Sequence, residues 1–591
     1  MNSRLTLNRI IILSDIIKST FIVDGIEISV SHEHGWSIDK TGVYEGGNFV
    51  SSPVWIHQAI INVGSKLVKV VIKGISPITD SLFESTTDYA NLQGGLNNPL
   101  MKALGNNGVR LKQGASKNLL EFLSQQKDVP TVFSFDKLGW HKNDEGKLLF
   151  VLPSQVLGEQ PDKRYLYMPD SDAPSQRALV ASGTLEEWQN NVVSACINNP
   201  IALFALGIAF AAALMRLFNV DGGGFHFWGA SSRGKTLLLQ IAATVFGNGA
   251  DPALLPDGSL IQRWNTTANA LEGTALAFND LLLPMDELGT SNIKNFGQAI
   301  YQLSGGVGKR AMNANRDMRA VRVWRVLMIS SGEYAITHEI EAKTGVQART
   351  GQLIRFIDIS VDNIFPTWRD VSEAKKKADA LKVACSQYYG VAALPFLEYV
   401  VKIANHAPSM QHWQNQFEII EDVLANEYPN LQAEQRRGIK RFALVACGLL
   451  MAVDAKCIVM DDAVIMDSVA HVLGLWLAEF PTVSEAERGV EYLKRFILSN
   501  PSRFGDANEM DSFGNNLVGY KDNSDKKRYI IFKEKMAEAC GRPNIKPVLK
   551  ELRNQGFLFH NSDRIDLRWR NTTVYGIHFA LVAETAEVPT N

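Results

Sequence analysis

The feature that most constrains the fold lies near the middle of the chain, where a glycine-bounded loop separates two apolar runs. The sequence reads Phe225-His226-Phe227-Trp228 and then Gly229-Ala230-Ser231-Ser232-Arg233-Gly234-Lys235-Thr236, followed by the apolar run Leu237 to Phe246. A strand, a GxxxxGK[ST] loop and a helix in this order make the pattern of a P-loop. We therefore expect an α/β protein whose core is a P-loop NTPase.

The residue types of this loop suit a nucleoside triphosphate. Two glycines let the backbone curl so that successive N–H groups point at phosphate oxygens, and the helix that begins near Lys235 adds the positive end of its dipole. Lys235 is expected to reach the β- and γ-phosphates, and Thr236 to offer its hydroxyl to Mg²⁺. A chance match in a glycine-rich turn is the alternative. ATP and Mg²⁺ are the predicted ligands, and the predicted binding residues are Gly229, Ser231, Ser232, Arg233, Gly234, Lys235 and Thr236.

Two later strands carry polar residues at their ends. Leu281 to Met285 is followed by Asp286 and Glu287, the Walker B pattern, in which the first acid holds Mg²⁺ through water and the second polarises the attacking water. Ser330 and Ser331 follow the strand Val326 to Ile329, where either hydroxyl is placed to sense the γ-phosphate. The alternatives are an acidic strand end without chemistry and a serine that caps its strand.

Three arginines are candidates for contacts with phosphate. Arg349 and Arg355 follow the serine strand, from which an arginine finger can cross a subunit interface to the γ-phosphate. A structural salt bridge is the alternative for each. Arg441 lies in a segment with helical periodicity, and we expect it on the helix surface or on a phosphate.

Two basic segments are candidates for contacts with DNA. Residues 305–325 hold six lysines and arginines, including Lys309 and Arg310, against one acid. They are predicted to form a hairpin that grips phosphates in a ring's central pore, the alternative being a solvated face. Near the C-terminus, Lys526 to Cys540 and Asn544 to Asn554 are expected to be helices ahead of a β-ribbon, a winged-helix pattern. The second helix has Lys546, Lys550 and Arg553 on one side, which suits duplex docking or a protein contact.

The composition limits which ligands the chain can bind and where in the cell it is expected. The net charge of −2 means that nucleic acid must be bound by local basic patches, because the chain as a whole does not attract polyanions. The five cysteines form no CxxC pair, so we expect reduced, buried thiols and no zinc site. No signal peptide is visible, and the most apolar run, Pro200 to Met215, is too short to cross a bilayer. We expect a cytoplasmic protein without a membrane contact.

The 591 residues are too many for a single core. Residues 1–115 are expected to form an N-terminal α/β domain, 116–183 a β-rich collar or linker domain, 184–365 the ATPase core, 366–500 a helical lid, and 501–591 the winged-helix domain. The core is expected to open at the Thr184 to Glu187 capping box, with one long helix running to about Phe218.

Seven segments resemble the AAA+ helicase module of mobile genetic elements. They are Thr184 to Trp188, Gly222 to Thr236, Trp264 to Asn269, Leu282 to Glu287, Gly306 to Arg310, Ser330 to Glu333 and Gly351 to Asp358. In phages and plasmids this module is often fused behind a primase, and in cassette and island elements it is similar to self-loading, MCM-like hexameric helicases. The resemblance covers roughly residues 125 to 450. It implies a hexameric ring that hydrolyses ATP between subunits and moves along DNA, with Lys309 as the lysine of the pore hairpin.

The sequence therefore favours an ATP-dependent DNA helicase or translocase that acts in replication of a mobile element. No primase signature is seen near the N-terminus, so priming, if needed, would come from a separate primase. Two alternatives stay open: an initiator or DNA-bound switch that uses ATP to assemble without unwinding, and an ATPase scaffold of an anti-phage defence system.

Overall fold

The computed structural model describes residues 16–582, except 96, 159–163, 170–173, 232, 310–320, 363, 367–369, 430, 481–483, 509–515, 543 and 561–563. The chain divides into two compact units at residues 172–173. Both units combine helices with strands, which confirms the expected α/β class. Within the described part, no helix is both long enough and apolar enough to cross a membrane.

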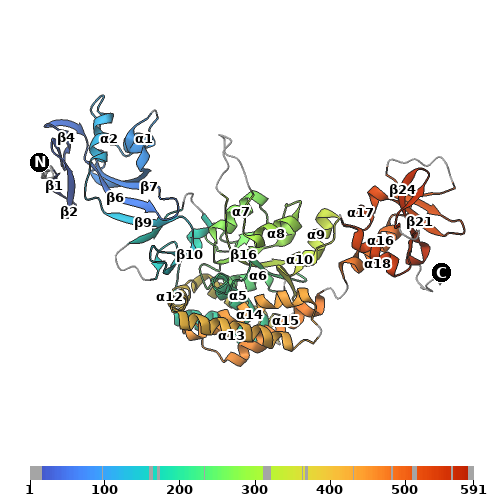
Figure 1. Cartoon of the computed structure of the whole chain (residues 1–591). Helices are drawn as coiled ribbons and strands as arrows, with labels where there is room; N and C mark the ends of the chain where they lie inside the picture. Colours follow the sequence, from blue (N-terminus) through green and yellow to red (C-terminus); the bar gives the residue numbers. More distant parts are fainter. Residues whose placement is uncertain are drawn as a thin grey trace, which may run out of the picture. The chain divides into compact units, whose positions relative to one another are not determined.

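The first unit is built on a five-stranded sheet, drawn in blue shades in Figure 1. In spatial order its strands are β13 (Tyr165–Tyr167), β9 (Thr131–Phe135), β6 (Val54–Asn62), β7 (Val68–Ser76) and β8 (Ser81–Asp88). The strands β6, β7 and β8 are antiparallel, whereas β9 and β13 join in parallel. This one sheet therefore draws strands from both sides of residue 115.

Smaller elements complete the first unit. The helices α1 (Pro99–Asn106) and α2 (Ser116–Ser124) pack on the sheet, where Phe122 of α2 shares a core with Trp55 and Ile72. The remaining strands are the hairpin of β1 (Ile16–Val23) and β2 (Ile26–Glu33), the group of β3 (Trp36–Asp39), β4 (Gly42–Glu45) and β5 (Asn48–Ser51), and the group of β10 (Gly139–Lys142), β11 (Leu148–Val151) and β12 (Val156–Leu157).

The second unit is centred on a five-stranded, wholly parallel sheet. Its spatial order is β15 (Gln262–Arg263), β16 (Leu282–Asp286), β17 (Leu327–Gly332), β14 (Gly223–Trp228) and β18 (Phe356–Ser360). Its central strands are almost completely buried, as expected for a parallel sheet covered by helices on both faces. The covering helices include α6 (Lys235–Ala243), α7 (Ala268–Ala277), α8 (Phe296–Gly305), α9 (Ile336–Thr344) and α10 (Thr350–Leu353), several of them labelled in Figure 1.

The segment leading to this sheet is broken where we predicted one long helix. The capping box of Thr184 and Glu187 is present and opens α3 (Leu185–Trp188), and α4 (Ser194–Cys196) follows after a wider turn. The chain then leaves the helical conformation before α5 (Pro200–Ala212), because proline lacks an N–H and disfavours helix at the residue before it. The single long helix was therefore a wrong prediction.

The helix α5 lies in the centre of the second unit, against the helices that follow the sheet. These are α11 (Val371–Gln387), α12 (Ala393–Ala404), α13 (Ala407–Asn426), α14 (Ala433–Asp454) and α15 (Asp462–Glu479), of which Figure 1 shows α13, α14 and α15 gathered beside α5. A side chain at Gly207 would meet Leu449 and Val445, and one at Gly448 would meet Ala211. Glycine at both positions therefore lets α5 and α14 approach closely.

Arg441 lies on α14, and both of its predicted placements are wrong. Its side chain is buried, and its guanidinium donates to the carbonyl oxygens of Ile354 (2.8 Å) and Gly222 (2.9 Å). Burial lowers the pKa of Arg441 to about 10. These carbonyls precede β18 and β14, so Arg441 fastens α14 to the amino end of the sheet.

The C-terminal region has its own core, in which α16 (Glu485–Ser499) packs against α18 (Lys546–Asn554). Its sheet contains β19 (Phe504–Asp506), β20 (Gly519–Asp522), β21 (Arg528–Phe532), β22 (Leu558–Phe559), β23 (Leu567–Trp569) and β24 (Thr572–His578). The predicted helix at Asn544 to Asn554 and the strands after it are confirmed. The helix predicted for Lys526 to Cys540 is wrong over its first half, because the aromatic and β-branched run at 529–532 pairs between two strands. Its second half is helical, as a 3₁₀ turn (Lys533–Lys535) followed by α17 (Met536–Ala539).

Candidate nucleotide-binding site

The loop after β14 has the backbone geometry that its glycines predict. Gly229 has φ +152°, and a Cβ there would lie 2.6 Å from the carbonyl oxygen of Val361. Gly234 has φ +86° and immediately precedes α6. Both positions therefore require glycine. Ser231 and Arg233 lie in the loop, Arg233 donating to the backbone oxygen of Asp362 at 3.1 Å, and the predicted Ser232 lies outside the described residues.

Lys235 is the first residue of α6 and points back along the loop. Its Nζ donates to the carbonyl oxygens of Gly229 (2.8 Å) and Ala230 (2.7 Å), and the residue is only 9% exposed. Burial lowers the pKa of Lys235, against the opposing effect of the Glu287, Glu333 and Asp286 carboxylates. The loop therefore holds an ammonium group at its centre, with acidic groups around it.

The end of β16 meets α6 through a set of hydroxyl and carboxylate groups. The Thr236 hydroxyl lies 3.3 Å from Asp286 Oδ1, and the Ser331 hydroxyl donates to the same oxygen in a short hydrogen bond. Ser331 Oγ in turn accepts the backbone N–H of Glu287 at 3.1 Å. This arrangement joins the predicted metal-binding pair Thr236 and Asp286 to one of the two predicted sensor serines.

Glu287 stands in an uncommon backbone conformation, with φ +59°. Left-handed backbone is unfavourable for a residue with a side chain and is concentrated at functional sites. Burial raises the pKa of Glu287, and the neighbouring Asp286 carboxylate raises it further. A carboxylate with a raised pKa is a better proton acceptor.

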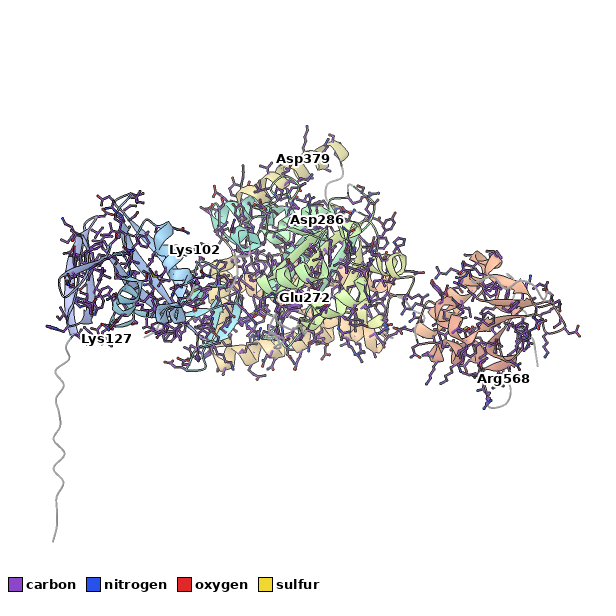
Figure 2. The ribbon with its side chains drawn as sticks, turned by 90° about the horizontal axis from the view of Figure 1, so that it is seen from above. Lys102, Lys127, Glu272, Asp286, Asp379 and Arg568 are labelled. Atoms are coloured by element: carbon purple, nitrogen blue, oxygen red, sulfur yellow. The ribbon has the colours of Figure 1, made fainter. Side chains whose placement is uncertain are left out.

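Lys235, Thr236, Glu287 and Ser331 line one cavity of about 1000 Å³, and Asp286 contacts Thr236 and Ser331. Its floor consists of the loop and α6, and one wall comes from the ends of β16 and β17, including Glu287, Ser331 and Glu333. The other wall is the segment from Asp362 to Pro366 and one side of α11, the helix on which Figure 2 labels Asp379. Figure 2 also labels Asp286 at the sheet. The cavity is large enough for a nucleotide.

The two predicted serines are separated by the structure. Ser331 lines the cavity, whereas Ser330 points into the core of the sheet. The Ser330 hydroxyl accepts from Trp264 Nε1 at 2.9 Å and contacts His226 Nδ1 at 3.0 Å, while His226 Nε2 lies 3.0 Å from the carbonyl oxygen of Tyr334. Because a carbonyl only accepts, Nε2 carries the proton and Ser330 donates to Nδ1. Burial lowers the pKa of His226 to about 4, so this histidine is neutral at pH 7.

The structure does not bring Arg349 or Arg355 to this cavity. Arg355 immediately precedes β18, at the amino end of a parallel sheet whose carboxyl end carries the loop. Its guanidinium donates to the Gly351 carbonyl at 2.8 Å and lies over the Tyr301 ring at 5.4 Å. Arg349 is exposed on the same side. Because β18 is five residues long, Arg355 lies about 15 Å from the loop of its own chain, and Arg349 lines a separate hollow beside Tyr301.

The predicted DNA contacts are partly described. Lys309 is exposed, with its backbone N–H 3.4 Å from the buried Glu272 carboxylate, and Arg310 lies outside the described residues. Lys546, Lys550 and Arg553 are exposed on α18, whose opposite face packs into the C-terminal core. Figure 2 labels a further exposed cation in this region, Arg568 of β23.

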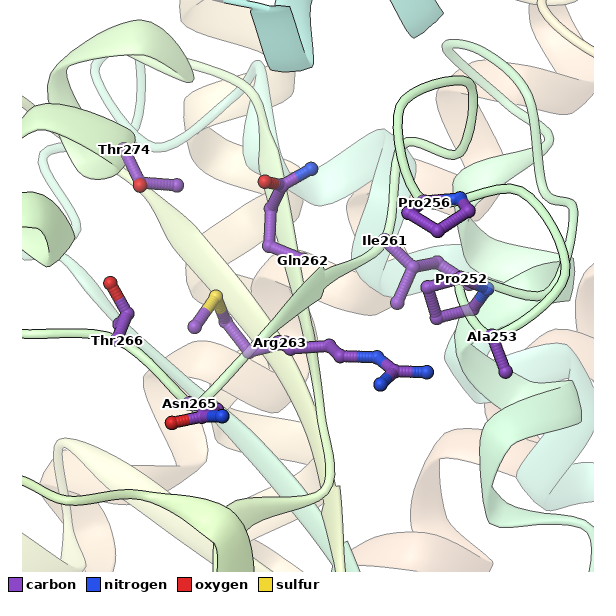
Figure 3. A pocket seen from close by; sticks show the side chains of 10 residues that line it. Pro252, Ala253, Pro256, Ile261, Gln262, Arg263, Asn265, Thr266 and Thr274 are labelled. Carbon is purple, nitrogen blue, oxygen red and sulfur yellow. The ribbon is translucent and has the colours of Figure 1, made fainter.

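A second hollow, of about 340 Å³, lies at the edge strand β15. Figure 3 shows the Arg263 side chain extending across it toward Ala253 and Pro252, with Thr266 and Thr274 on the other side. Arg263 is opposite Asp286 in the strand register, so this hollow opens at the same end of the sheet as the larger cavity.

Sequence reasoning missed several cavity residues. Glu333 stands only two residues after Ser331, and its position after a sensor strand was an available signal. The contribution of α11, through Lys375, Asp379 and Lys382, carries no motif. Gln240 and Asp251 also line the cavity, and no local pattern distinguishes them from ordinary core and loop residues.

Comparisons with known proteins agree with this architecture. A family model described as a domain of unknown function, DUF927, matches residues 29–323, and one described as the Cch helix turn helix domain matches residues 484–574. No curated protein matches the chain. The solved structure titled "SCCmec type IV Cch - active helicase" aligns with a TM-score of 0.65 at 18% identity, covering 93% of this chain and 98% of that chain.

Two apo structures titled as the NrS-1 C terminal region align with 10% and 11% identity. They cover 88% and 67% of this chain, and 95% and 88% of their own chains. Their TM-scores of 0.27 and 0.23 are too low to support an inference. The chain therefore shares its fold with a Cch helicase and carries a C-terminal segment that matches the Cch helix-turn-helix family.

Proposed function

We propose that this protein is an ATP-dependent DNA helicase or translocase of a mobile genetic element, working as a hexameric ring. In this proposal residues 184–365 are a P-loop ATPase core of the AAA+ class, with a helical lid after it and a C-terminal winged helix. The observation that carries the proposal is the convergence of Lys235, Thr236, Glu287 and Ser331 on one cavity at the carboxyl end of a parallel sheet, with Asp286 in contact with Thr236 and Ser331. Ligands of open α/β sheets bind at this end.

The residues fit a nucleoside triphosphate with Mg²⁺. Backbone N–H groups of the loop and the Lys235 ammonium suit phosphate oxygens, and the paired carbonyl contacts of Lys235 are ones that phosphate oxygens can replace. Thr236 and Asp286 supply a hydroxyl and a carboxylate, which are the hard oxygen donors that Mg²⁺ takes beside phosphates and water. When bound, the ion neutralises charge on the phosphates.

Glu287 is the proposed general base. Its carboxylate accepts a proton from a water molecule as the water oxygen attacks the γ-phosphorus and the bond from the γ-phosphorus to the bridging oxygen breaks. The left-handed backbone at Glu287 and the raised pKa of its carboxyl both suit this role. Ser331 contacts both Asp286 and the Glu287 N–H, so it fixes the two acids relative to each other, and it lines the cavity, where it is proposed to contact the γ-phosphate.

The arginine fingers are proposed to act on the neighbouring subunit. Arg349 and Arg355 lie at the end of the sheet opposite their own cavity, so they serve catalysis only through a second copy of the chain. The exposed Arg349 is free to extend, whereas Arg355 must first release the Gly351 carbonyl. Assembly into a ring would place this face of one subunit against the cavity of the next.

Contacts with DNA are proposed at two places. Lys309 and Arg310 belong to the basic segment 305–325, which would grip single-stranded phosphates in the pore. The exposed cations of α18 would dock on duplex DNA. Priming, if required, would come from a separate protein.

DNA-stimulated ATP hydrolysis and displacement of a strand from a forked duplex test this proposal. The Glu287→Gln variant should still bind ATP, while its turnover and its unwinding fall by about 1000-fold, because only the proton acceptor is lost. Glu398→Gln, at an exposed glutamate of α12, is the matched control and should behave as wild type. Wild-type protein that hydrolyses ATP but never separates the fork would refute the helicase assignment.

The match of residues 484–574 to a helix-turn-helix family favours one second candidate, an initiator that assembles on DNA with ATP and does not unwind it. A Lys309→Ala/Arg310→Ala variant separates the two. Helicase action through the pore predicts loss of strand displacement with duplex binding retained, whereas an initiator retains its DNA assembly in full.

A further inference from the structure

The inner wall of the cavity contains a buried amide that the chemistry above does not use. Gln240 lies on α6 and lines the cavity, yet it is only 1% exposed. It stands five residues after Lys235, which places it about 7.5 Å further along the helix axis than the phosphate loop. A nucleotide whose phosphates lie in the loop would extend its base toward this part of the wall.

The orientation of the Gln240 amide is determined by its neighbours. Its Nε2 donates to the carbonyl oxygen of Gly249 at 3.0 Å, and only the nitrogen of the amide can make that bond. A Cβ on Gly249 would lie 2.5 Å from the backbone oxygen of Gln240 and 3.0 Å from that of Cys385, so glycine lets this segment pack closely on α6 and α11. The amide oxygen of Gln240 therefore points away from the Gly249 carbonyl.

That oxygen, Oε1, is buried and accepts no hydrogen bond from any residue that the structure describes. A buried acceptor without a donor costs free energy, and native proteins rarely retain one without a reason. A ligand that brings an N–H into the cavity would satisfy it.

The surroundings of the cavity suit a flat ring. Ala374 and Ala378 lie one turn apart on α11 and line the cavity, and their short side chains leave room beside the helix. The apolar side chains of Ile364 and Phe365 line the same wall and are almost fully buried. Beside the charged Lys375, Asp379 and Lys382 of α11, these four side chains give the cavity an apolar surface on which an aromatic heterocycle can lie.

We infer that Gln240 reads the nucleobase, its Oε1 accepting a hydrogen bond from the exocyclic 6-amino group of adenine. A 6-oxopurine presents an acceptor at that position, which would place oxygen against oxygen and leave both unpaired. The inference rests on the proposed function, because it takes the phosphates to lie in the Gly229 to Thr236 loop.

Equilibrium competition against a fluorescent ATP analogue, with Mg²⁺ present, tests this inference on the full-length protein. The competitors are ATP, purine riboside 5′-triphosphate, which lacks the 6-amino group, and inosine 5′-triphosphate, which carries a 6-oxo group. Wild type should bind ATP about 2- to 10-fold more tightly than the purine analogue, the contribution of one hydrogen bond, and about 10- to 100-fold more tightly than the inosine nucleotide. Equal binding of all three would overturn the inference.

The Gln240→Met variant should bring the three dissociation constants to within about 2-fold of one another. Gln126→Met, at a buried glutamine of the first unit that accepts the Ile56 N–H, is the matched control and should retain the wild-type ratios. A Gln240→Met variant with unchanged ratios would refute the inference, and if that variant fails to fold, the wild-type series still decides. Failure of every triphosphate to bind would instead refute the proposed function.

Discussion

At the carboxyl end of the parallel sheet, Lys235, Glu287 and Ser331 lie around one open cavity, whereas at the amino end Arg355 and Arg441 are bound by backbone carbonyls. Both ends gather charged side chains, but those of the first surround the larger space, of about 1000 Å³, whereas Arg349 lines a separate hollow of about 850 Å³. The charges at the amino end instead satisfy carbonyl oxygens or, at Arg349, face solvent.

This difference teaches that one chain holds only part of the proposed catalytic site. In the proposed function the carboxyl end supplies phosphate binding, the metal-binding pair and the base, and neither Arg349 nor Arg355 lines that cavity. Catalysis by an arginine finger therefore requires the amino end of another copy. Substitutions at each end of the sheet, and then in the strands between the two ends, test this division of roles.

The largest effect is expected from Lys235→Ala. Loss of the ammonium group removes the main positive charge from the carboxyl end, and ATP turnover should fall by about 1000-fold or more. Steady-state phosphate release measures this change. Lys402→Ala, at an exposed lysine of α12, should leave turnover unchanged, and a Lys235→Ala protein with wild-type turnover would show that the cavity is not the catalytic site.

A somewhat smaller loss, of about 100- to 1000-fold in turnover with ATP binding retained, is expected for alanine at whichever of Arg349 and Arg355 is the finger. Arg436→Ala, at an exposed arginine of α14, serves as the control. The sharper test mixes the inactive finger variant with Lys235→Ala protein. Shared interfaces would then pair an intact cavity with an intact arginine, so activity should return. No recovery on mixing would mean that the two ends do not cooperate between subunits.

The sequence predicted which side chains gather at the carboxyl end of the sheet, but it did not predict the contacts at the amino end. The loop glycines, Lys235 and Asp286 are recognisable because phosphate and metal binding impose residue types at fixed spacing. Arg441 was misplaced because helical periodicity cannot distinguish an arginine that binds carbonyls in the interior from one on the surface. The role of Ser330 depends on Trp264 and His226, which lie 66 and 104 residues away in sequence, and no local pattern reports such a contact.

The adjacent serines of β17 should give different kinds of defect. Ser331→Ala removes the contact with Asp286 and Glu287, so turnover should fall by about 10-fold while the free energy of unfolding changes little. Ser330→Ala leaves the Trp264 N–H and His226 without their partner, so it should cost about 1–3 kcal/mol in the free energy of unfolding. Urea unfolding and turnover, measured on both variants, distinguish the two serines. The reverse pattern would contradict the assignment of Ser331 to the cavity.

The smallest effect is a pH dependence that arises between the two ends, at Asp358 of β18. Its carboxylate accepts the backbone N–H of Ile336, the first residue of α9, at 3.0 Å, and burial raises the pKa of Asp358 from 3.8 to about 7. Between these values the folded protein keeps a proton that the unfolded chain releases. The contribution of Asp358 to the free energy of unfolding is therefore greatest below about pH 4. It falls as the pH rises to about 7, by at most about 1.4 kcal/mol per pH unit.

Asp358→Asn cannot lose a proton, so the variant should gain stability relative to wild type as the pH rises from 4 to 7, and the difference should then become constant. Urea unfolding of both proteins at pH 5, 6, 7 and 8 measures it. The buried His226, whose pKa of about 4 gives stability the opposite pH dependence, is present in both proteins and cancels in the difference. A difference that does not change with pH would show that Asp358 is ionised in the folded protein, and the link between β18 and α9 would then be a charged hydrogen bond rather than a neutral one.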